Sequence, residues 1–380
     1  MNILHTIPGR NWGGMEHRTV EQVRWLKAHG HAVWLATPSD GQTWARAQAA
    51  GLPLLPFDFD RPWHPASVRA FRRLVIERGI ELIDTHVTRD AKVAATCLDL
   101  CAVVRSRHVN QPLKPSPLRR MQWRLGADHV ITVAECTRTA LLADGLADPR
   151  RSTAIGGWAD DAFFAAAGPA ERAVLRGQLG LAADAYVWLC VGMIRPDKGQ
   201  DHLFDALTLL AARGLRPTVV VVGAATAESA GYEAELRRRA GELTSPVVFT
   251  GYREDVAALM RMADAVVIPS LTEAQPRVAV QAFAVGRPVV ASAVGGVPEI
   301  VTPGETGWLV PPADPAALAE AMEAVMAKPA AAGAVATRAR LLAEATMRFD
   351  HRMKLTLDTY RAALEHAHIR AFPRFRGNNR

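Results

Sequence analysis

The sequence predicts an α/β protein with two domains, each built on a parallel sheet that helices cover. Short apolar runs rich in β-branched residues alternate with helical patterns along the whole chain, which is typical of sheets buried on both faces. The chain has 380 residues, of which 49% are hydrophobic and 22% charged. This is a globular composition, and it is too long a chain for one ordinary core.

Strands and helical patterns alternate in both halves. The expected strands of the first half are 3–7, 32–37, 52–57, 80–85, 102–109, 129–133 and 152–155, with helical patterns over 15–29, 65–78, 90–100 and 117–125. The expected strands of the second half are 187–191, 218–222, 247–250, 265–269, 288–292 and 307–310. A glycine- and proline-containing stretch over 156–169 separates the two sets.

These patterns set the expected domains. We expect an N-terminal domain over 1–160 and a C-terminal domain over 170–345. In the last segment, 346–380, a helix over 346–367 would pack back toward the N-terminal domain and end in a basic tail. Ligands of such sheets bind at the carboxyl ends of the strands, which for two domains predicts a site in the cleft between them.

Charge and targeting signals restrict the partners. The formal net charge of +7 suggests an anionic partner, and no recognisable nucleic-acid motif accompanies it. The four cysteines have no zinc-like spacing and are interpreted as reduced thiols. Neither a signal peptide nor a long uncharged apolar run is evident, so we expect a cytoplasmic protein.

Three loops at expected strand ends suit a phosphorylated ligand. Gly13 and Gly14 precede a helix, where a backbone can approach an anion closely, although a plain strand-to-helix turn is equally open. Arg195 and Lys198 follow strand 187–191 and can balance the charge of a leaving diphosphate, with a solvated turn as the alternative. Glu273 follows strand 265–269, ahead of a helix N-terminus near residue 276 that can hold phosphate.

Taken in chain order, these motifs resemble one known family. The motifs are Gly13-Gly14-x-Glu16, Arg195-Pro196-x-Lys198-Gly199, Glu273, Gly286-x-Pro288-Val289-Val290, Gly295-Gly296-x-Pro298-Glu299 and Gly304-x-Thr306-Gly307. Together they look like glycosyltransferase family 4. The resemblance implies the GT-B fold, with two Rossmann-like domains facing a central cleft. It also implies retaining transfer of a sugar from a nucleoside-diphosphate donor, with an acceptor-side first domain and a nucleotide-sugar-binding second domain.

The resemblance also implies roles for individual residues. By motif position, Lys198 and Arg195 bind the diphosphate, although the family's arginine usually stands two residues earlier, at Met193 here. Glu273 lies near the donor sugar, and Gln281 replaces the second carboxylate of the family's Glu-x7-Glu motif, which bonds the ribose hydroxyls. An amide keeps both an acceptor and a donor for that contact.

Further site residues follow from position in the motifs. His86 resembles the family's histidine near the sugar, with His108 as the second candidate. The other nucleotide-sugar-binding candidates are Gly13, Gly14, Tyr252, Arg277 and Val278. Asp58 and Asp60 spell the metal-binding motif of a different glycosyltransferase fold, but we interpret them as a solvated turn. We therefore expect no metal and no cofactor besides the nucleotide-sugar co-substrate.

The family makes bacterial surface polysaccharides, lipopolysaccharide cores and glycolipids, which implies a glycan or lipid-linked acceptor. The helical pattern 117–125 adds an anionic membrane surface as a further expected partner. Its apolar positions Leu118, Met121 and Leu125 share one face, and the other face carries Arg119, Arg120, Trp123 and Arg124. A basic face with a tryptophan suits the inner surface of the cytoplasmic membrane. A surface helix packed on the sheet through its apolar stripe is the alternative.

Two other functions are compatible with the same motifs. A nucleotide-sugar 2-epimerase shares the architecture, and a catalytically weak homologue that only binds sugar nucleotide would tolerate Gln281. The Arg195–Lys198 string and Glu273 favour the transferase.

Overall fold

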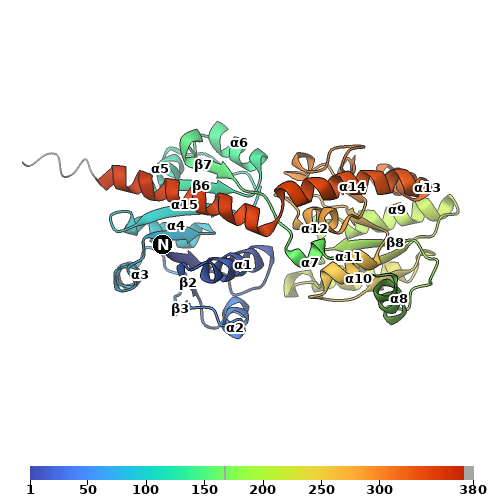
Figure 1. Cartoon of the computed structure of the whole chain (residues 1–380), viewed down its shortest axis with the longest axis horizontal. Helices are drawn as coiled ribbons and strands as arrows, with labels where there is room; N and C mark the ends of the chain where they lie inside the picture. The colour runs from blue at the N-terminus through green and yellow to red at the C-terminus, as the bar shows by residue number, and fades with distance from the viewer. Residues whose placement is uncertain (167, 372–380) are drawn as a thin grey trace, which may run out of the picture. The chain divides into compact units, whose positions relative to one another are not determined.

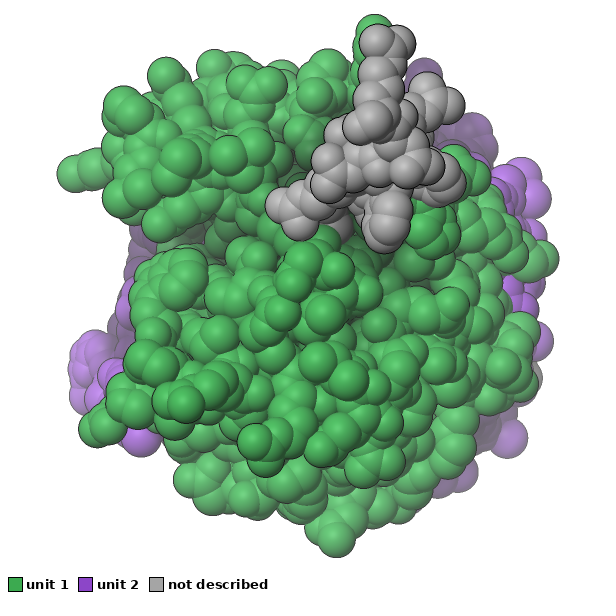
Figure 2. All heavy atoms as spheres, turned by 90° about the vertical axis from the view of Figure 1, so that its left-hand side faces the viewer, with its two compact units in different colours: residues 1–155, 353–380 green, residues 156–352 purple. Residues whose placement is uncertain are grey.

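The computed structural model describes residues 1–166 and 168–371, which form two compact units. Unit 1 comprises Met1–Ile155 and the chain from Met353, and unit 2 comprises Gly156–Arg352. Figure 2 colours the two units separately. Residues 372–380, which belong to the expected basic tail, lie outside the described residues.

Unit 1 has a seven-stranded parallel sheet with the order β3-β2-β1-β4-β5-β6-β7 (Figure 1). Its strands are β1 (Asn2–Thr6), β2 (Ala32–Thr37), β3 (Leu54–Pro56), β4 (Leu82–Thr85), β5 (Ala102–Arg107), β6 (His129–Thr132) and β7 (Ser152–Ala154). Its helices are α1 (Gly14–Ala28), α2 (Gln42–Ala49), α3 (Pro65–Glu77), α4 (Thr88–Ala94), α5 (Pro117–Leu125), α6 (Glu135–Ala143) and the part of α15 (Phe349–Ala371) from Met353 on. The strand order reverses between β1 and β4, and such a switch point is where parallel sheets bind ligands.

Unit 2 has a six-stranded parallel sheet with the order β10-β9-β8-β11-β12-β13. Its strands are β8 (Val187–Val191), β9 (Thr218–Val222), β10 (Val247–Phe249), β11 (Ala265–Ile268), β12 (Val289–Ser292) and β13 (Trp308–Val310). Its helices are α7 (Asp161–Phe164), α8 (Pro169–Gln178), α9 (Gln200–Ala212), α10 (Ala230–Ala240), α11 (Val256–Met262), α12 (Arg277–Val285), α13 (Pro315–Ala327) and α14 (Pro329–Thr346). The switch point of this sheet lies between β8 and β11.

Strand β8 shows why the strands read as continuous apolar runs. Val187 and Leu189 lie in one hydrophobic cluster, whereas Trp188 and Cys190 lie in another on the opposite face. All four side chains are buried. Since successive residues of a strand point to opposite faces, helices must cover both faces of this sheet, and the predicted parallel α/β architecture is confirmed.

Two predicted helices are wrong in length. The pattern over 90–100 stays α-helical only to Ala94 and continues as a 3-10 turn, Ala95–Cys97. The predicted helix 346–367 corresponds to α15, but α15 begins later, at Phe349, and extends to Ala371, because Thr346 is the last residue of α14. The backbone between them pairs with Ala159, whose N–H donates to Met347 and whose carbonyl accepts from Phe349.

Helix α5 turns the opposite face inward from the one expected. Trp123 is only 5% exposed, and the guanidinium groups of Arg105 and Arg107 lie over its ring at 3.7 and 5.7 Å. Leu118, Met121 and Leu125 are 59%, 51% and 69% exposed. The expected basic face carrying the tryptophan and the expected packing through the leucine stripe are therefore both wrong. The cation–π contact with β5 and the burial of the large indole explain the orientation.

No helix within residues 1–166 and 168–371 combines the length and the hydropathy needed to cross a membrane.

Candidate active site

The loops that follow β8 and β11 meet at the switch point of unit 2. Lys198 lies in the loop after β8, and its Nζ donates to Oε1 of Glu273 in the loop after β11 at 2.6 Å. The Ser270 hydroxyl donates to the same carboxylate oxygen at 2.8 Å. The two side chains are only 22% and 13% exposed. The structure thus brings together the predicted diphosphate cation and the predicted sugar-side carboxylate.

A glycine with a left-handed backbone fixes these two loops against each other. Gly199 has φ +66°, and a Cβ built there would lie 2.1 Å from the carbonyl oxygen of Pro269. The amide of Leu271 also donates to the carbonyl of Asp197 at 2.9 Å. The Arg-Pro-x-Lys-Gly string therefore needs its glycine for a close backbone approach.

Arg195 lies in the same loop but does not join the ion pair. Its Nη2 donates to the Asp197 carboxylate at 2.7 Å. Its Nε is buried without a hydrogen-bond partner among the described residues. At Met193, where the family has its arginine, the backbone carbonyl accepts from the side-chain Nε2 of Gln200 at 3.0 Å.

Helix α12 carries three other predicted site residues, Arg277, Val278 and Gln281. All three are partly exposed. Arg277 lies over the ring of Trp158 at 5.5 Å. The loop ahead of α12 is held from two sides: Gln275 Oε1 accepts from the Gly157 amide, and the Ala274 carbonyl accepts from the Gly296 amide at 2.7 Å. The Gly295-Gly296 motif thus supports the Glu273 loop.

Tyr252 comes from another strand of the same sheet. It follows Gly251 after β10, two strands away from β8, and is half exposed.

In the loop after β1, two glycines leave room for the carboxylate of Glu16. Gly13 caps α1, and its amide donates to Glu16 Oε2 at 3.0 Å. A Cβ at Gly9 or Gly13 would lie 3.1 or 3.2 Å from the Glu16 carboxylate. Gly14 is the first residue of α1 and has open space at its Cβ position. Burial raises the pKa of Glu16 above its ordinary value.

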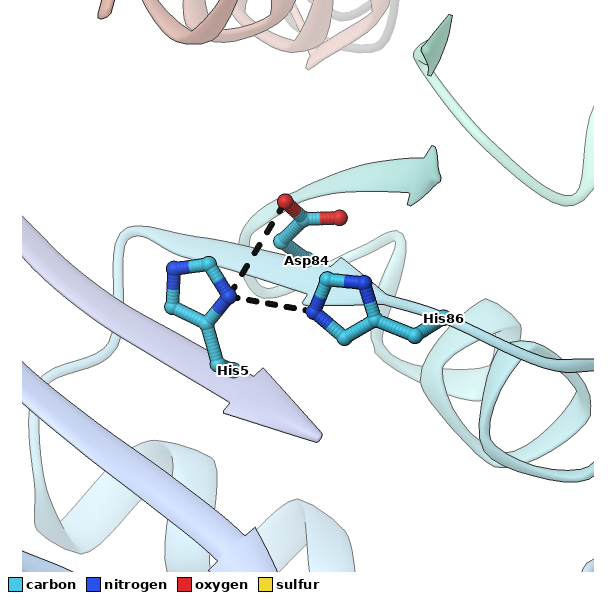
Figure 3. Close-up of side chains that lie close together, drawn as sticks. All are labelled: His5, Asp84 and His86. Atoms are coloured by element: carbon cyan, nitrogen blue, oxygen red, sulfur yellow. Dashed lines mark hydrogen bonds and ion pairs between the residues drawn. The ribbon is translucent and has the colours of Figure 1, made fainter. Parts of the chain in front are cut away.

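Three histidines form a row at the switch point of unit 1. His5 Nδ1 lies 3.1 Å from His86 Nε2, and His86 Nδ1 lies 2.9 Å from His108 Nε2. Figure 3 shows His5 on β1 pointing toward His86 at the end of β4. His86 is 3% exposed, whereas His108 is partly exposed. His86 is therefore the interior member of the row, and of these two candidates His108 is the one with access to solvent.

Sequence reasoning missed the residues that complete this row. Asp84 pairs in register with His5 across β4 and β1. Its carboxylate accepts from Tyr360 of α15 at 2.6 Å and from Ser106 at 2.8 Å. Burial raises the pKa of Asp84 to about 7 and lowers the pKa of His5 to about 3.

His5, Asp84 and His86 have metal-ligand chemistry, with ligand atoms within 4.8 Å of one another. The ring planes of His5 and His86 differ by 6°, and their centroids are 5.4 Å apart. With nitrogens only 3.1 Å apart, such rings must meet edge to edge, so each nitrogen points at the other. A zinc ion needs ~2 Å to each nitrogen and does not fit on that line. The geometry is that of a hydrogen bond.

Asp58 and Asp60 are held by arginines. Arg10 contacts both carboxylates at 3.3 Å and also pairs with Asp40 at 2.9 Å. Arg89 pairs with Asp60 from α4. The two side chains are 58% and 46% exposed, as expected for a solvated turn, and they also take part in an ion-pair cluster.

Comparison with known proteins agrees with these features. The family described as Glycosyltransferase Family 4 matches residues 12–162, and that described as Glycosyl transferases group 1 matches residues 185–328. A D-inositol 3-phosphate glycosyltransferase from a Nocardioides species is 30% identical, with 95% of this chain and 88% of that protein covered. The chain spans about half the length of other curated relatives of that name, for example 53% of the one from Mycolicibacterium paratuberculosis.

Solved structures show the same fold. A glycosyltransferase from Rickettsia africae superposes with a TM-score of 0.87 over 96% of this chain and 98% of that one, at 17% identity. Anabaena HepE in complex with UDP-glucose superposes with a TM-score of 0.80 over 94% and 99%, at 23% identity. The chain therefore belongs to glycosyltransferase family 4 and has the GT-B fold.

Proposed function

We propose that this chain is a retaining glycosyltransferase that moves a sugar from a nucleoside-diphosphate donor to a glycan or lipid-linked acceptor. The observation that carries the proposal is the contact between Lys198 and Glu273 at 2.6 Å in a partly buried site. Breaking a glycosidic bond to diphosphate leaves positive charge on the anomeric carbon and negative charge on the phosphate. A cation and an anion side by side match that separation of charge.

Donor binding would exchange the partners of this ion pair. Lys198 would turn to the diphosphate, and Glu273 would accept from a hydroxyl of the donor sugar and face the anomeric carbon. Arg195 and the N-terminus of α12 would add positive charge at the phosphates. Gln281, Arg277 and Val278 would contact the nucleoside from α12. Gly13, Gly14 and Tyr252 would also contact the nucleotide-sugar donor.

We infer that the reaction needs no metal, since Lys198 and the α12 N-terminus supply the positive charge that a metal would otherwise supply. Transfer measured in excess EDTA should retain most of the activity. Loss of activity in EDTA that manganese restores would contradict this inference.

The donor and reaction type are tested directly on the purified chain. Thermal-shift titrations with UDP-, GDP- and ADP-sugars identify the base, and UDP-glucose is the first choice because HepE, at 23% identity, was solved with it. Transfer of the labelled sugar to an acceptor, with the anomeric configuration of the product read by NMR, tests retention. An epimerase would instead convert the labelled donor without an acceptor, and a binding homologue would turn over neither.

Two acceptor classes compete. A lipid-linked glycan fits a role in bacterial cell-surface polysaccharide or lipopolysaccharide synthesis, with the protein peripheral on the inner face of the cytoplasmic membrane. A phosphorylated polyol is favoured by the name of the 30% identical relative, a D-inositol 3-phosphate glycosyltransferase. Assays with inositol phosphate and with a lipid-linked glycan, each at saturating donor, separate the two classes.

The membrane part of the proposal rests on the corrected face of α5. Leu118, Met121 and Leu125 are exposed, and basic side chains of the same helix accompany them: Arg119, Arg120 and Arg124. Exposed apolar residues flanked by cations suit an anionic bilayer surface.

Cosedimentation with anionic vesicles at low salt tests this surface. Serine at the three apolar positions should abolish binding, because it removes the side chains that would enter the interface. A matched control places serine at Ile76 and Leu341, which are also exposed but lie on α3 and α14. Equal binding of both variants and the wild type would remove the proposal.

A further inference from the structure

The histidine row of unit 1 continues beyond the histidines into helix α15. Tyr360 is fully buried, donates to Asp84 Oδ2 at 2.6 Å and lies 3.5 Å from His5 Nε2 through its oxygen. A single chain of polar contacts therefore runs from α15 through β1 and β4 to His108 after β5. The proposed function as stated above assigns no role to this chain of contacts.

The two links between histidines are N–H···N hydrogen bonds. They join ring nitrogens at 3.1 and 2.9 Å, and the first pair of rings meets edge to edge within 6° of one plane. Burial lowers the pKa of His5 and of His108 to about 3, so both rings are neutral at neutral pH. A neutral imidazole has one N–H and one acceptor nitrogen. The two N–H···N bonds can therefore point in either of two directions along the row, and each direction fixes which nitrogen carries the hydrogen in all three rings.

Tyr360 selects between the two directions. Its hydrogen is used on Asp84, so the Tyr360 oxygen offers only lone pairs to His5 Nε2. Above its pKa of about 7 the Asp84 side chain is an ionised carboxylate, which accepts from Tyr360 at Oδ2 and from Ser106 at Oδ1 and has no hydrogen to donate. A hydrogen on His5 Nε2 satisfies the tyrosine, whereas its absence would place two acceptors against each other.

The choice at His5 then passes along the row. With its hydrogen on Nε2, His5 accepts at Nδ1 from His86 Nε2–H. His86 in turn accepts at Nδ1 from His108 Nε2–H, which leaves His108 with Nδ1 as its acceptor nitrogen. His108 is the partly exposed member of the row.

We propose that Tyr360 and Asp84 are positioning residues that fix the tautomer of His108, so that its Nδ1 accepts a hydrogen bond from a sugar hydroxyl during transfer. The catalytic role given to His108 rests on the proposed function, but the tautomers can be measured whether or not the chain is active.

Other charged groups around the row remain unchanged in the variants below. Asp90 of α4 accepts from the Thr6 hydroxyl at 2.7 Å and from the His86 amide at 2.8 Å. Arg18 of α1 donates to the Ile155 carbonyl at 2.9 Å, and its charge further lowers the pKa of His86 and of His108. Because Asp90 and Arg18 keep their own partners in the variants, substitution of Tyr360 tests the effect of its hydroxyl alone.

The test uses the full chain labelled with ¹⁵N-histidine and long-range ¹H–¹⁵N correlation spectra, which distinguish Nδ1–H from Nε2–H tautomers. His→Gln variants assign the signals. In the wild type, at a pH well above the Asp84 pKa of about 7, we expect His5, His86 and His108 to carry the hydrogen on Nε2. Tyr360→Phe should move at least His5 and His86 toward the Nδ1–H form, and kcat should fall about tenfold, as for one lost hydrogen bond. The donor KM should be unchanged.

A matched control removes the same kind of contact elsewhere. Tyr232 of α10 donates to Asp201 at 3.0 Å in unit 2, so Tyr232→Phe also loses a tyrosine–carboxylate bond. It should leave all three histidine tautomers unchanged. If Tyr360→Phe does not fold, Asp84→Asn keeps the side-chain size, weakens the hold on the tyrosine hydrogen and should shift the same signals.

Two results would overturn the inference: the Nδ1–H form in the wild-type row, or tautomers that neither Tyr360→Phe nor Asp84→Asn changes. Because the spectra need no substrate, these outcomes are separate from a failure of the proposed transferase activity, which would appear as no turnover with intact wild-type tautomers.

Discussion

The ion pair between Lys198 and Glu273 gives the sharpest test of the proposed chemistry. Lys198→Met and Glu273→Gln each remove one charge while keeping the side-chain length. In the ligand-free chain the two groups are 2.6 Å apart and mostly shielded from water. Each would therefore act on the breaking bond from a site of low dielectric constant. One such contact lowers a barrier by ~3–4 kcal/mol, so each variant should lower kcat about 100- to 1,000-fold.

The double variant is the informative measurement. Both groups would stabilise opposite ends of one breaking bond, so once one is lost the other can contribute less. The double variant should therefore lose much less activity than the product of the two single losses. Steady-state kinetics with saturating acceptor, over a range of donor concentrations, gives kcat and the donor KM for all four proteins.

A matched ion pair in the same unit controls for loss of charge alone. Arg213, directly after α9, and Glu323 of α13 are 2.7 Å apart, away from the two loops. Arg213→Met with Glu323→Gln should leave kcat unchanged. The reasoning is refuted if Lys198→Met changes only the donor KM, or if the losses of the Lys198 and Glu273 variants multiply.

Three further outcomes follow from the structure. Gln281→Ala should weaken donor binding about tenfold by the loss of neutral hydrogen bonds, and Gln281→Glu should be tolerated; a loss of kcat without a change in donor affinity, measured by steady-state kinetics, would contradict the assignment. Gly199→Ala should cost about 2 kcal/mol of stability from its left-handed backbone alone and more from the contact with Pro269, as measured by urea unfolding; an unchanged midpoint would refute it. Burial raises the pKa of Asp84 from 3.8 to about 7, so within that window Asp84 holds a proton in the folded chain that it releases in the unfolded chain, and its contribution to the free energy of unfolding falls as pH rises. Asp90 and the buried histidines titrate in the same window, so the measurement is the difference between wild type and Asp84→Asn in denaturant titrations: the wild type should lose stability relative to the variant as pH rises, and a difference that does not change with pH would refute the assignment.

The sheets could be predicted closely because their strands carry a strong local signal. The runs 32–37, 187–191 and 218–222 coincide with β2, β8 and β9. β8 and β9 are buried on both faces and β2 is mostly buried, so nearly every residue is apolar, and turn residues bound each run. The face of α5 could not be predicted in this way. Periodicity groups Leu118 with Met121 and Leu125, but the side that faces the sheet is set by tertiary contacts of Trp123, with Arg105 and with the apolar cluster that buries its ring.

Some residues of the candidate site could likewise be predicted from local sequence, and others could not. Lys198 and Glu273 stand in short motifs, and the loops that carry them follow adjacent strands, so sequence reasoning could find both. His5 and Tyr360 belong to no motif. They are 355 residues apart, and their contact depends on the register of β1 with β4 and on where α15 packs. Only tertiary structure reveals a network whose members are chosen by position and not by local spacing.

The division of the chain also has a consequence for biosynthesis. Unit 1 is completed by the chain from Met353, after all of unit 2 has been made. During translation the first 155 residues emerge without Tyr360, so the Asp84 carboxylate and the His5 ring lack the partner that later covers them. Unit 2 is contiguous, so its whole sequence has been made once Arg352 is added. Unit 2 is therefore complete in sequence before unit 1, although the synthesis of unit 1 begins first, and unit 1 cannot reach its native state until Tyr360 has been added.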